Sequence, residues 1–215
     1  MPLPFYHIAA AGALAEKYAS VRESGDFFLG NIAPDAVLAR PGCTLAEKFG
    51  THLRGERAAW GGDVAASFTC SDKSDPFLLG YHMHLIMDIF FRDWWEALFR
   101  RQGIPEDEWD ALAYRAASRG VGQLLASGDV LFHDYETWIA TARTYRRKTF
   151  PFGMTGAQMD AEIEFCANLS PYVGIEMKEE TGPVNFSEIY REAVPYLDEI
   201  FGAHLRELPG NGGVV

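Results

Sequence analysis

The chain has 215 residues, of which 48% are hydrophobic and 23% charged, so it holds enough apolar material for one folded domain over residues 1–215. Lysine and arginine total 19 against 30 aspartate and glutamate residues, which gives a formal net charge of -11. A surface of that sign repels polyanions, so a nucleic-acid-binding protein is not expected. Carboxylates gathered around a divalent cation can nevertheless bind a phosphate group.

The sequence contains no pattern that directs the chain into or across a membrane. Its start lacks a basic segment followed by a long apolar one, so no signal peptide is predicted. The most apolar stretch, residues 77–99, contains histidine, aspartate and arginine side chains that would be costly to bury in lipid. We therefore expect no transmembrane helix and interpret the protein as cytoplasmic.

Helical periodicity dominates the sequence from its start, and strand patterns are nearly absent. The pattern predicts a helix over residues 7–22 and a short helical or turn-rich stretch over 27–38. Residues 40–75 are rich in glycine and are expected to form loops around short helices.

A long central helix is predicted to follow. Ser74-Asp75-Pro76 is a strong helix start, because a capping side chain is followed by a proline whose missing N–H is not needed there. The helix should continue to about residue 101, before Gly103. It is apolar on most sides, which is typical of the buried central helix of a bundle.

Further helices are expected over residues 105–127, 134–148, 155–168 and 187–205, the third because its first residues fit a capping box. The predicted fold class is therefore all-α, a multi-helix bundle around the central helix.

His84 and Asp88 are the first candidate metal ligands. They are four residues apart on the central helix and so lie on one face, where an imidazole and a carboxylate can bind one zinc ion. The alternative is a buried His84 bonded to a neighbour, with Asp88 paired to Arg92. Taken alone, an H-x-x-x-D pair favours that alternative, because chance produces it often.

Three more ligand-type residues lie upstream of this pair. His7 is at the start of the first predicted helix, Asp35 follows a proline, and His52 lies in Gly-Thr-His-Leu. Residues at turns and helix ends can converge on the face of another helix. An unpaired Asp88 in an apolar helix would be costly, and a bound metal would remove that cost. The context therefore favours a metal site.

Three segments resemble the zinc-dependent phospholipase C family. They are Phe-Phe-Leu-Gly-Asn-Ile-Ala-Pro-Asp (27–35), Gly-Thr-His-Leu (50–53) and Asp-Pro-Phe-Leu-Leu-Gly-Tyr-His-Met-His-Leu-Ile-Met-Asp (75–88). The similarity covers about residues 4 to 100 and is closer to an uncharacterised cytoplasmic bacterial branch of that family. The family shares its helical fold with the zinc single-strand nucleases.

The resemblance implies a set of metal ligands by position. One zinc ion would be held by Asp35, His52, His84 and Asp88, and a second ion would share Asp35 with His7. The family's third ion uses a further histidine and an H-x-x-x-E, and this sequence has neither in the corresponding place. We therefore expect one or two ions of zinc, or of manganese or another divalent metal.

The function that the resemblance implies is hydrolysis of a phosphoester or phosphodiester by a metal-activated water that attacks phosphorus. Asp35 is the candidate general base, and a small-molecule or lipid-headgroup phosphoester is the candidate substrate. The missing third-ion ligands favour an alternative, a metal-stabilised helical binding protein without turnover. The sequence does not indicate the identity of the substrate or the oligomeric state.

Three weaker candidates remain. His82 points away from His84 on the helix, so packing or an outer contact is expected for it. His133-Asp134 is similar to the H-D pair of another helical phosphohydrolase superfamily but lacks that superfamily's other ligands. Arg54 is a candidate for attracting an anionic substrate, with a surface role as the alternative.

Overall fold

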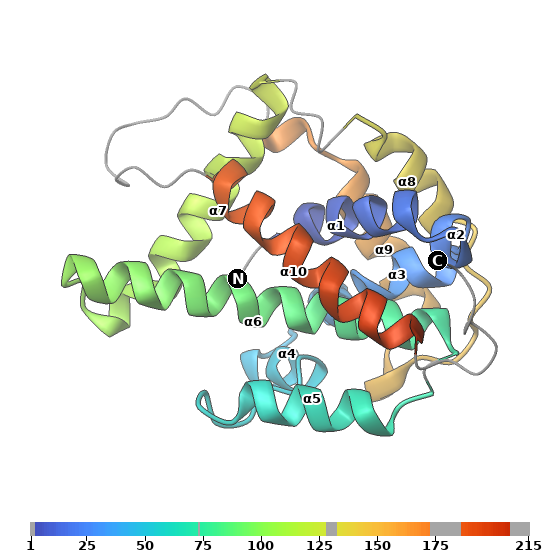
Figure 1. The fold of residues 1–215 in the computed structure, drawn as a ribbon, viewed down its shortest axis with the longest axis horizontal. Helices are drawn as coiled ribbons and strands as arrows, with labels where there is room; N and C mark the ends of the chain where they lie inside the picture. Colours follow the sequence, from blue (N-terminus) through green and yellow to red (C-terminus); the bar gives the residue numbers. More distant parts are fainter. Residues whose placement is uncertain (1–2, 73, 128–132, 173–185, 207–215) are drawn as a thin grey trace.

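In the computed structural model, the described residues are 3–72, 74–127, 133–172 and 186–206. Helices cover more than half of the chain, and no strand occurs within these ranges (Figure 1). The predicted all-α class and its multi-helix arrangement are confirmed. None of the described helices is both long and apolar enough to cross a membrane.

The longest helix is α6 (Pro76–Gln102), which lies across the molecule as the predicted central helix (Figure 1). The Asp75 side chain accepts hydrogen bonds from N–H groups of the first turn, as the capping pattern predicts. Gly103 ends the helix in the left-handed conformation, with φ 68°. Helices α1, α3, α5, α7 and α10 all pack against it.

The N-terminal segment is divided more finely than the sequence predicts. Helix α1 (Pro4–Lys17) starts earlier than expected and ends where Tyr18 adopts an extended conformation, φ -113° and ψ 101°. A separate single turn, α2 (Ala19–Arg22), follows. The predicted helical or turn-rich stretch consists of α3 (Gly25–Gly30) and a 3-10 helix, η1 (Ala33–Ala39).

Two short helices precede the central one, where loops around short helices were expected. Helix α4 (Leu45–Thr51) starts with a capping box formed by Thr44 and Glu47, and it packs against η1. Helix α5 (Trp60–Cys70) packs against α6. Both lie on the side of α6 opposite to α1 and α7 in Figure 1.

The later helices cover the centre of the molecule. They are α7 (Trp109–Ser127), α8 (Tyr135–Ala142), α9 (Gly156–Ala167) and α10 (Phe186–Arg206), with short 3-10 turns at Glu106–Glu108 (η2), Pro151–Gly153 (η4) and Ser170–Tyr172 (η5). The predicted capping box at the start of α9 is present. Helix α10 crosses α6 and packs against α1, while α9 packs against η1 (Figure 1).

Helix α8 is shorter than the predicted helix over residues 134–148. It ends at Ala142, and the backbone N–H groups of Arg146 and Arg147 instead donate hydrogen bonds to the carboxylate of Asp26. These bonds satisfy groups that a longer helix would have satisfied internally.

Helices α3 and α6 approach each other backbone to backbone at two glycines. A Cβ atom on Gly30 would lie 2.2 Å from the carbonyl oxygen of Phe77, and one on Gly80 would lie 2.2 Å from that of Phe27. Only glycine allows so close an approach. The crossing fixes α3 against the part of α6 that carries the predicted metal ligands.

Candidate metal centre

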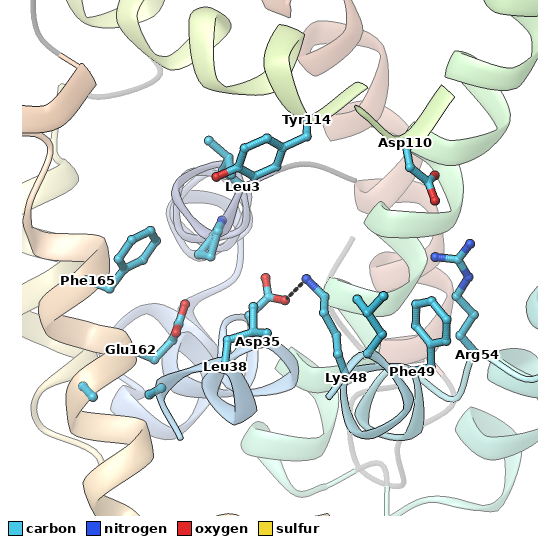
Figure 2. Close-up of a pocket in the computed structure, with 14 residues that line it drawn as sticks. Leu3, Asp35, Leu38, Lys48, Phe49, Arg54, Asp110, Tyr114, Glu162 and Phe165 are labelled. Atoms are coloured by element: carbon cyan, nitrogen blue, oxygen red, sulfur yellow. Dashed lines mark ion pairs between the residues drawn. The ribbon is translucent and has the colours of Figure 1, made fainter. Parts of the chain in front are cut away.

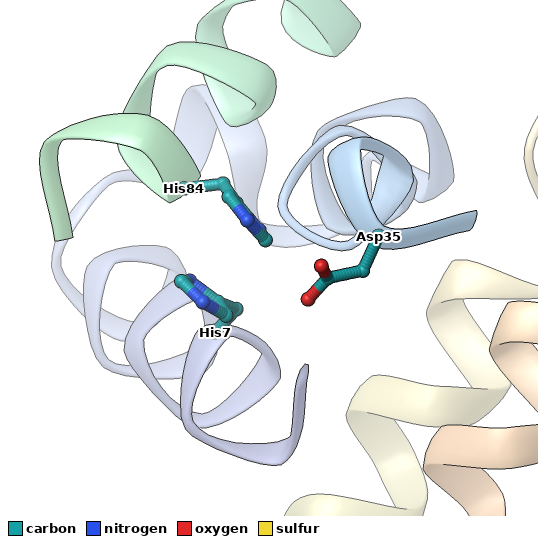
Figure 3. A group of neighbouring side chains, drawn as sticks. All are labelled: His7, Asp35 and His84. Carbon is teal, nitrogen blue, oxygen red and sulfur yellow. The ribbon is translucent and has the colours of Figure 1, made fainter. Parts of the chain in front are cut away.

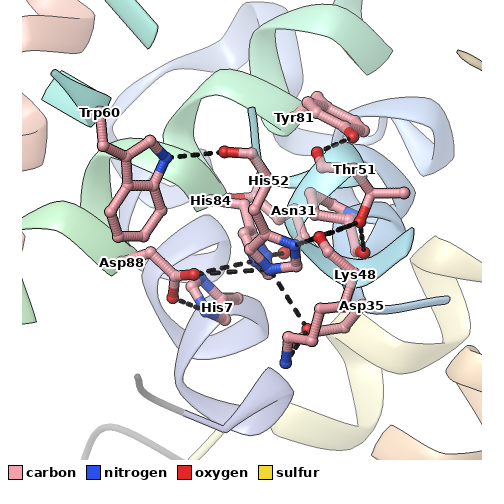
Figure 4. Close-up of polar contacts among 11 residues, drawn as sticks. His7, Asn31, Asp35, Lys48, Thr51, His52, Trp60, Tyr81, His84 and Asp88 are labelled. Carbon is pink, nitrogen blue, oxygen red and sulfur yellow. Dashed lines mark hydrogen bonds and ion pairs between the residues drawn. The ribbon is translucent and has the colours of Figure 1, made fainter. Parts of the chain in front are cut away.

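The five predicted ligands meet at one buried place, although they come from separate segments (Figure 4). Helix α1, the 3-10 helix η1, the residue that ends α4, and helix α6 supply them: His7, Asp35, His52, His84 and Asp88. Each of the five is 3% exposed or less. Polar groups of this kind are seldom buried together unless they bind one another or an ion.

Four of the ligand groups are spaced as a small cation would require. Nε2 of His52 lies 3.3 Å from Nε2 of His84 and 3.3 Å from Oδ1 of Asp35. Oδ2 of Asp88 lies 3.5 Å from Nε2 of His52 and 3.8 Å from Nε2 of His84. Tetrahedral zinc with bonds of about 2.0–2.1 Å places neighbouring ligand atoms about 3.3 Å apart. The observed spacings therefore fit one ion with small adjustments.

Several of the atoms at this place lack hydrogen-bond partners among the residues that the structure describes. They are both carboxylate oxygens of Asp88, both ring nitrogens of His7 and Oδ1 of Asp35. Buried polar atoms are almost always paired, and a buried ion without a partner costs several kcal/mol. A divalent cation between these groups would remove that cost. By this test the residues fit a metal ion.

Backbone carbonyls orient two of the imidazoles. Nδ1 of His84 lies 2.8 Å from the carbonyl oxygen of Asn31, and Nδ1 of His52 lies 2.8 Å from that of Lys48. Because a carbonyl oxygen only accepts, we assign the hydrogen to Nδ1 in both rings, which leaves the Nε2 lone pair directed at the centre. This arrangement is typical of metal-binding histidines.

His7 completes the cluster by stacking on His84 (Figure 3), with ring centroids 3.7 Å apart and planes 13° from parallel. Its ion-pair contact is with Asp88, at 3.4 Å, rather than with Asp35, the partner that the resemblance implies. Ligand atoms of His7, Asp35 and His84 still lie within 4.8 Å of one another, as do those of His52, His84 and Asp88. Since His84 has one free nitrogen and belongs to both groups, the five residues describe one centre.

The protonation states also suit metal binding. Burial, followed by the charge of His7, lowers the pKa of His84 to about 3, so this ring is neutral at neutral pH. Burial acts to raise the pKa of Asp88, but the interaction with His7 and the neighbouring imidazoles lower it below its usual value. The pKa of Asp35 is likewise held well below its usual range, against burial, by Lys48 and the adjacent histidines. Metals bind neutral imidazoles and ionised carboxylates.

Two ionisable residues beside the centre were missed by sequence reasoning. Nζ of Lys48 in α4 lies 2.9 Å from Oδ1 of Asp35, and the lysine side chain is only 17% exposed. Glu162 in α9 is buried, and its Oε1 has no hydrogen-bond partner within the described part of the chain. Burial, and then the charge of Asp35, raise the pKa of Glu162 to about 8. Lys48 stands four residues before His52, the spacing of one helical turn, and this was the signal that could have found it. Glu162 has no such spacing from any of the ligands.

The centre lies at the edge of a cavity of about 720 Å³ (Figure 2). Asp35, Lys48 and Glu162 line it on the side of the centre, and Arg54 and Asp110 stand beyond Lys48. Its walls also include four exposed apolar side chains: Leu38, Leu45, Tyr114 and Phe165. This volume is in the range of small-molecule sites, about 300–1,000 Å³.

The alternative of a buried, bonded His84 with Asp88 paired to Arg92 holds only for His84, which is buried and bonded to the carbonyl of Asn31. The expected pair between Asp88 and Arg92 is wrong. Arg92 instead pairs with Asp93 at 2.7 Å and approaches Glu96 at 3.9 Å. Asp88 is 1% exposed and faces the histidines.

The weaker candidates lie apart from the centre. Nδ1 of His82 lies 2.7 Å from the carbonyl oxygen of Leu78, and the ring lines a different cavity, of about 340 Å³. His133 and Asp134 are 79% and 52% exposed, at the start of α8, away from the buried cluster. Arg54 lines the cavity beside the centre, as a residue that attracts anions would.

Comparison of the chain with protein-family models, with curated proteins and with solved structures found no match.

Proposed function

We propose that the protein binds one divalent metal ion, zinc, and uses it to hydrolyse phosphoesters or phosphodiesters. The observation that carries the proposal is the cluster of five buried ligand-type residues at the edge of a cavity. Structural zinc sites are closed, whereas catalytic ones keep a position open to substrate. Asp35 contacts the centre and also lines the cavity, so a ligand in the cavity has access to the ion.

The donor set supports zinc. Three imidazoles and two carboxylates are nitrogen and oxygen donors, which suit zinc, whereas magnesium and calcium are bound mainly by oxygen. Manganese or another divalent transition metal is the alternative. The similarity of residues 27–35, 50–53 and 75–88 to the zinc-dependent phospholipase C family also supports zinc and a phosphoester substrate.

Separate residues would bind the ion and accept the proton. His52, His84 and Asp88 hold the ion, and His7 contacts the same carboxylate from the other side. A bound divalent ion polarises a phosphoryl oxygen and makes a water ligand more acidic. Asp35 is ionised at neutral pH, so it is able to orient the attacking water and accept its proton, although its low pKa limits how strongly it holds that proton.

The cavity supports a substrate that combines an anionic and an apolar part. Lys48 and Arg54 supply positive charge, while exposed apolar side chains form much of the remaining wall. A small phosphoester or a lipid headgroup with part of its apolar chain fits this description. A long nucleic acid does not suit a chain with a net charge of -11.

A second candidate function is metal-dependent ligand binding without turnover. One contact favours it, because Lys48 already pairs with Asp35, the residue assigned to move the proton. The sequence also lacks the ligands of the third ion in the resembling family.

The first test measures metal content after zinc loading and removal of excess. The parent is expected to hold one zinc per chain by elemental analysis, and His84→Ala and Asp88→Ala to hold none. His82→Ala is the matched control, because His82 lies on the same helix but outside the cluster, and it should retain the metal. Circular dichroism checks that each variant is folded. Full zinc content in both ligand variants would place the site elsewhere.

The second half of the test measures turnover of bis-p-nitrophenyl phosphate by the same preparations. Asp35→Asn should lose about 10²–10⁴-fold in rate while retaining metal, because an amide oxygen can coordinate but cannot accept the proton. Activity should rise with pH towards neutrality. A zinc-replete parent that hydrolyses no phosphoester on a broad panel, or an Asp35→Asn variant as active as the parent, would leave the binding protein as the better description.

A further inference from the structure

Lys48 is an unusual lysine because it is nearly enclosed by acidic groups. Its Nζ lies 2.9 Å from Oδ1 of Asp35, the charge of Asp88 also acts on it, and Glu162 lines the same cavity. The side chain is 17% exposed, and lysine is rarely buried to this degree unless it is paired. A lysine side chain, whose usual pKa is about 10.4, carries a positive charge at neutral pH.

The position of this cation relative to the metal ligands is specific. Oδ1 of Asp35 is shared between Nε2 of His52, at 3.3 Å, and Nζ of Lys48, at 2.9 Å. The carboxylate oxygen that faces the centre is therefore also the one that the ammonium contacts, and Lys48 itself lines the cavity (Figure 2). A second metal ion that bound this oxygen from the side of the cavity would have to displace the ammonium.

The ammonium of Lys48 changes the net charge of the site. Asp35 and Asp88 carry one negative charge each, and Lys48 offsets one of them. A single divalent ion then makes the site positive overall, as required for an anionic ligand. The ammonium has three N–H donors, of which Asp35 can accept only some, so donors remain for a ligand in the cavity.

We propose that Lys48 is the second cation of this centre: its ammonium stands beside Asp35 where a second metal ion would otherwise be needed, and it binds the anionic end of the ligand that enters the cavity. This inference rests on the proposed function, because it assumes that His52, His84 and Asp88 hold an ion next to Asp35. It adds a residue that binds the phosphoryl group directly and that no ligand motif indicates.

The test compares zinc and inorganic phosphate binding in the same variants by calorimetry. Lys48→Met removes the charge but keeps an unbranched side chain of similar length, and Lys48→Arg keeps the charge. Lys17→Met is the matched control, since Lys17 is 61% exposed in α1 and pairs with Asp198 away from the cavity.

The expected result is a loss of phosphate affinity without any loss of zinc affinity. Zinc-loaded Lys48→Met should bind phosphate at least about tenfold more weakly than the parent, because a charge-assisted hydrogen bond is lost. The same variant should bind zinc as tightly as the parent or more tightly, because a positive charge beside the ion has been removed. Lys48→Arg should stay within a few-fold of the parent for phosphate, and Lys17→Met should match the parent in both.

Two results would overturn the inference. One is unchanged phosphate affinity in Lys48→Met, which would mean that the ammonium does not touch the anion. The other is a loss of both zinc and phosphate affinity, which would make Lys48 only a structural support for Asp35.

A measurement on the parent alone covers the case in which Lys48→Met does not fold. Acylation of lysines in the zinc-loaded protein is followed by mass spectrometry with and without phosphate. Phosphate should protect Lys48 and leave the labelling of Lys17 unchanged, and equal labelling of Lys48 under both conditions would contradict the proposal.

The two proposals fail in different ways. A parent that binds zinc and phosphate through Lys48 but hydrolyses no phosphoester would overturn the proposed hydrolase and keep this inference. If the parent hydrolyses phosphoesters but Lys48→Met binds phosphate as tightly as the parent, the proposed hydrolase is kept and this inference is overturned.

Discussion

The pKa values of Glu162 and His84 are shifted in opposite directions from their usual values. Each shift gives the metal-free protein a different dependence of stability on pH. The pKa of Glu162 is raised from 4.5 to about 8, so the folded state binds a proton that the unfolded state has lost over this interval. The pKa of His84 is lowered from 6.5 to about 3, so here the unfolded state binds the extra proton. Stability therefore falls as pH rises through the Glu162 interval, and it falls as pH drops through the His84 interval.

We predict that Glu162→Gln removes the alkaline part of this dependence. In chelator-treated protein, the free energy of unfolding in urea should fall by about 1 kcal/mol per pH unit between about pH 6.5 and pH 8, above the interval in which His84 has the opposite effect, and the variant should lack this slope. Glu164→Gln is the control, because Glu164 is 66% exposed on the same helix and should leave the slope unchanged. Parallel curves for the parent and Glu162→Gln would show that Glu162 titrates normally.

The sequence revealed the metal ligands better than it revealed their neighbours. His84 and Asp88 follow from a spacing on one helix, and Asp35 and His52 from short segments that resemble a family. Lys48 lies in a short segment whose polar residues look like those of a solvent-exposed helix. Only the packing of α4 against η1 brings its side chain to Asp35. That is a tertiary property, which no local pattern contains.

At the scale of the helices, the α3–α6 crossing places the imidazole of His84 within reach of the carbonyl of Asn31. Gly30 and Gly80 allow the crossing, since a Cβ atom on either would meet a backbone oxygen at 2.2 Å. Backbone atoms cannot rotate away as a flexible side chain can, so a methyl group at Gly80 has to push the two helices apart.

Gly80→Ala is therefore expected to lower the free energy of unfolding by about 1–3 kcal/mol, the usual range for overpacking. It should also weaken zinc binding, because the separation moves Asn31 away from His84. The control is Gly62→Ala in α5, where a Cβ atom would meet nothing within 4 Å and alanine should be neutral or stabilising by up to about 1 kcal/mol. Denaturant unfolding and zinc titration measure both effects, and an unchanged Gly80→Ala would mean that the crossing is more pliable than the structure indicates.

Helix ends that depend on neighbouring residues were predictable from the sequence, whereas those that depend on distant residues were not. The start and end of α6 were predictable because Asp75, Pro76 and Gly103 act locally. The early end of α8 was not, because Asp26, far away in the sequence, binds the N–H groups that follow it.

At the scale of the whole molecule, the all-α class was predictable because helical periodicity and capping signals recur along the chain. The cavity was not, because its walls come from the N-terminal residues, η1, α4, α7 and α9 together. A sequence pattern identifies which face of a helix is apolar but not which faces leave a space between them.

We predict that zinc stabilises the whole fold. An ion that binds only the folded state at a hundred times its Kd adds about 2.7 kcal/mol, and for a chain of this size each kcal/mol raises Tm by about 2–4 °C. Calorimetry should show a rise in Tm of several degrees on adding zinc, reversed by a chelator. His84→Ala should show no rise, and an equal rise in that variant would indicate zinc binding elsewhere.

The stacking of His7 on His84 joins α1 to a helix that begins some seventy residues later, and this has a consequence for the order of folding. His84 and Asp88 come together as soon as one turn of α6 forms, whereas His7 has to close a loop containing all of the intervening chain. Closing so long a loop is slow and entropically costly. Zinc that meets a nascent chain would therefore be held first by α6 alone, and α1, although synthesised first, would be the last segment to dock on the ion.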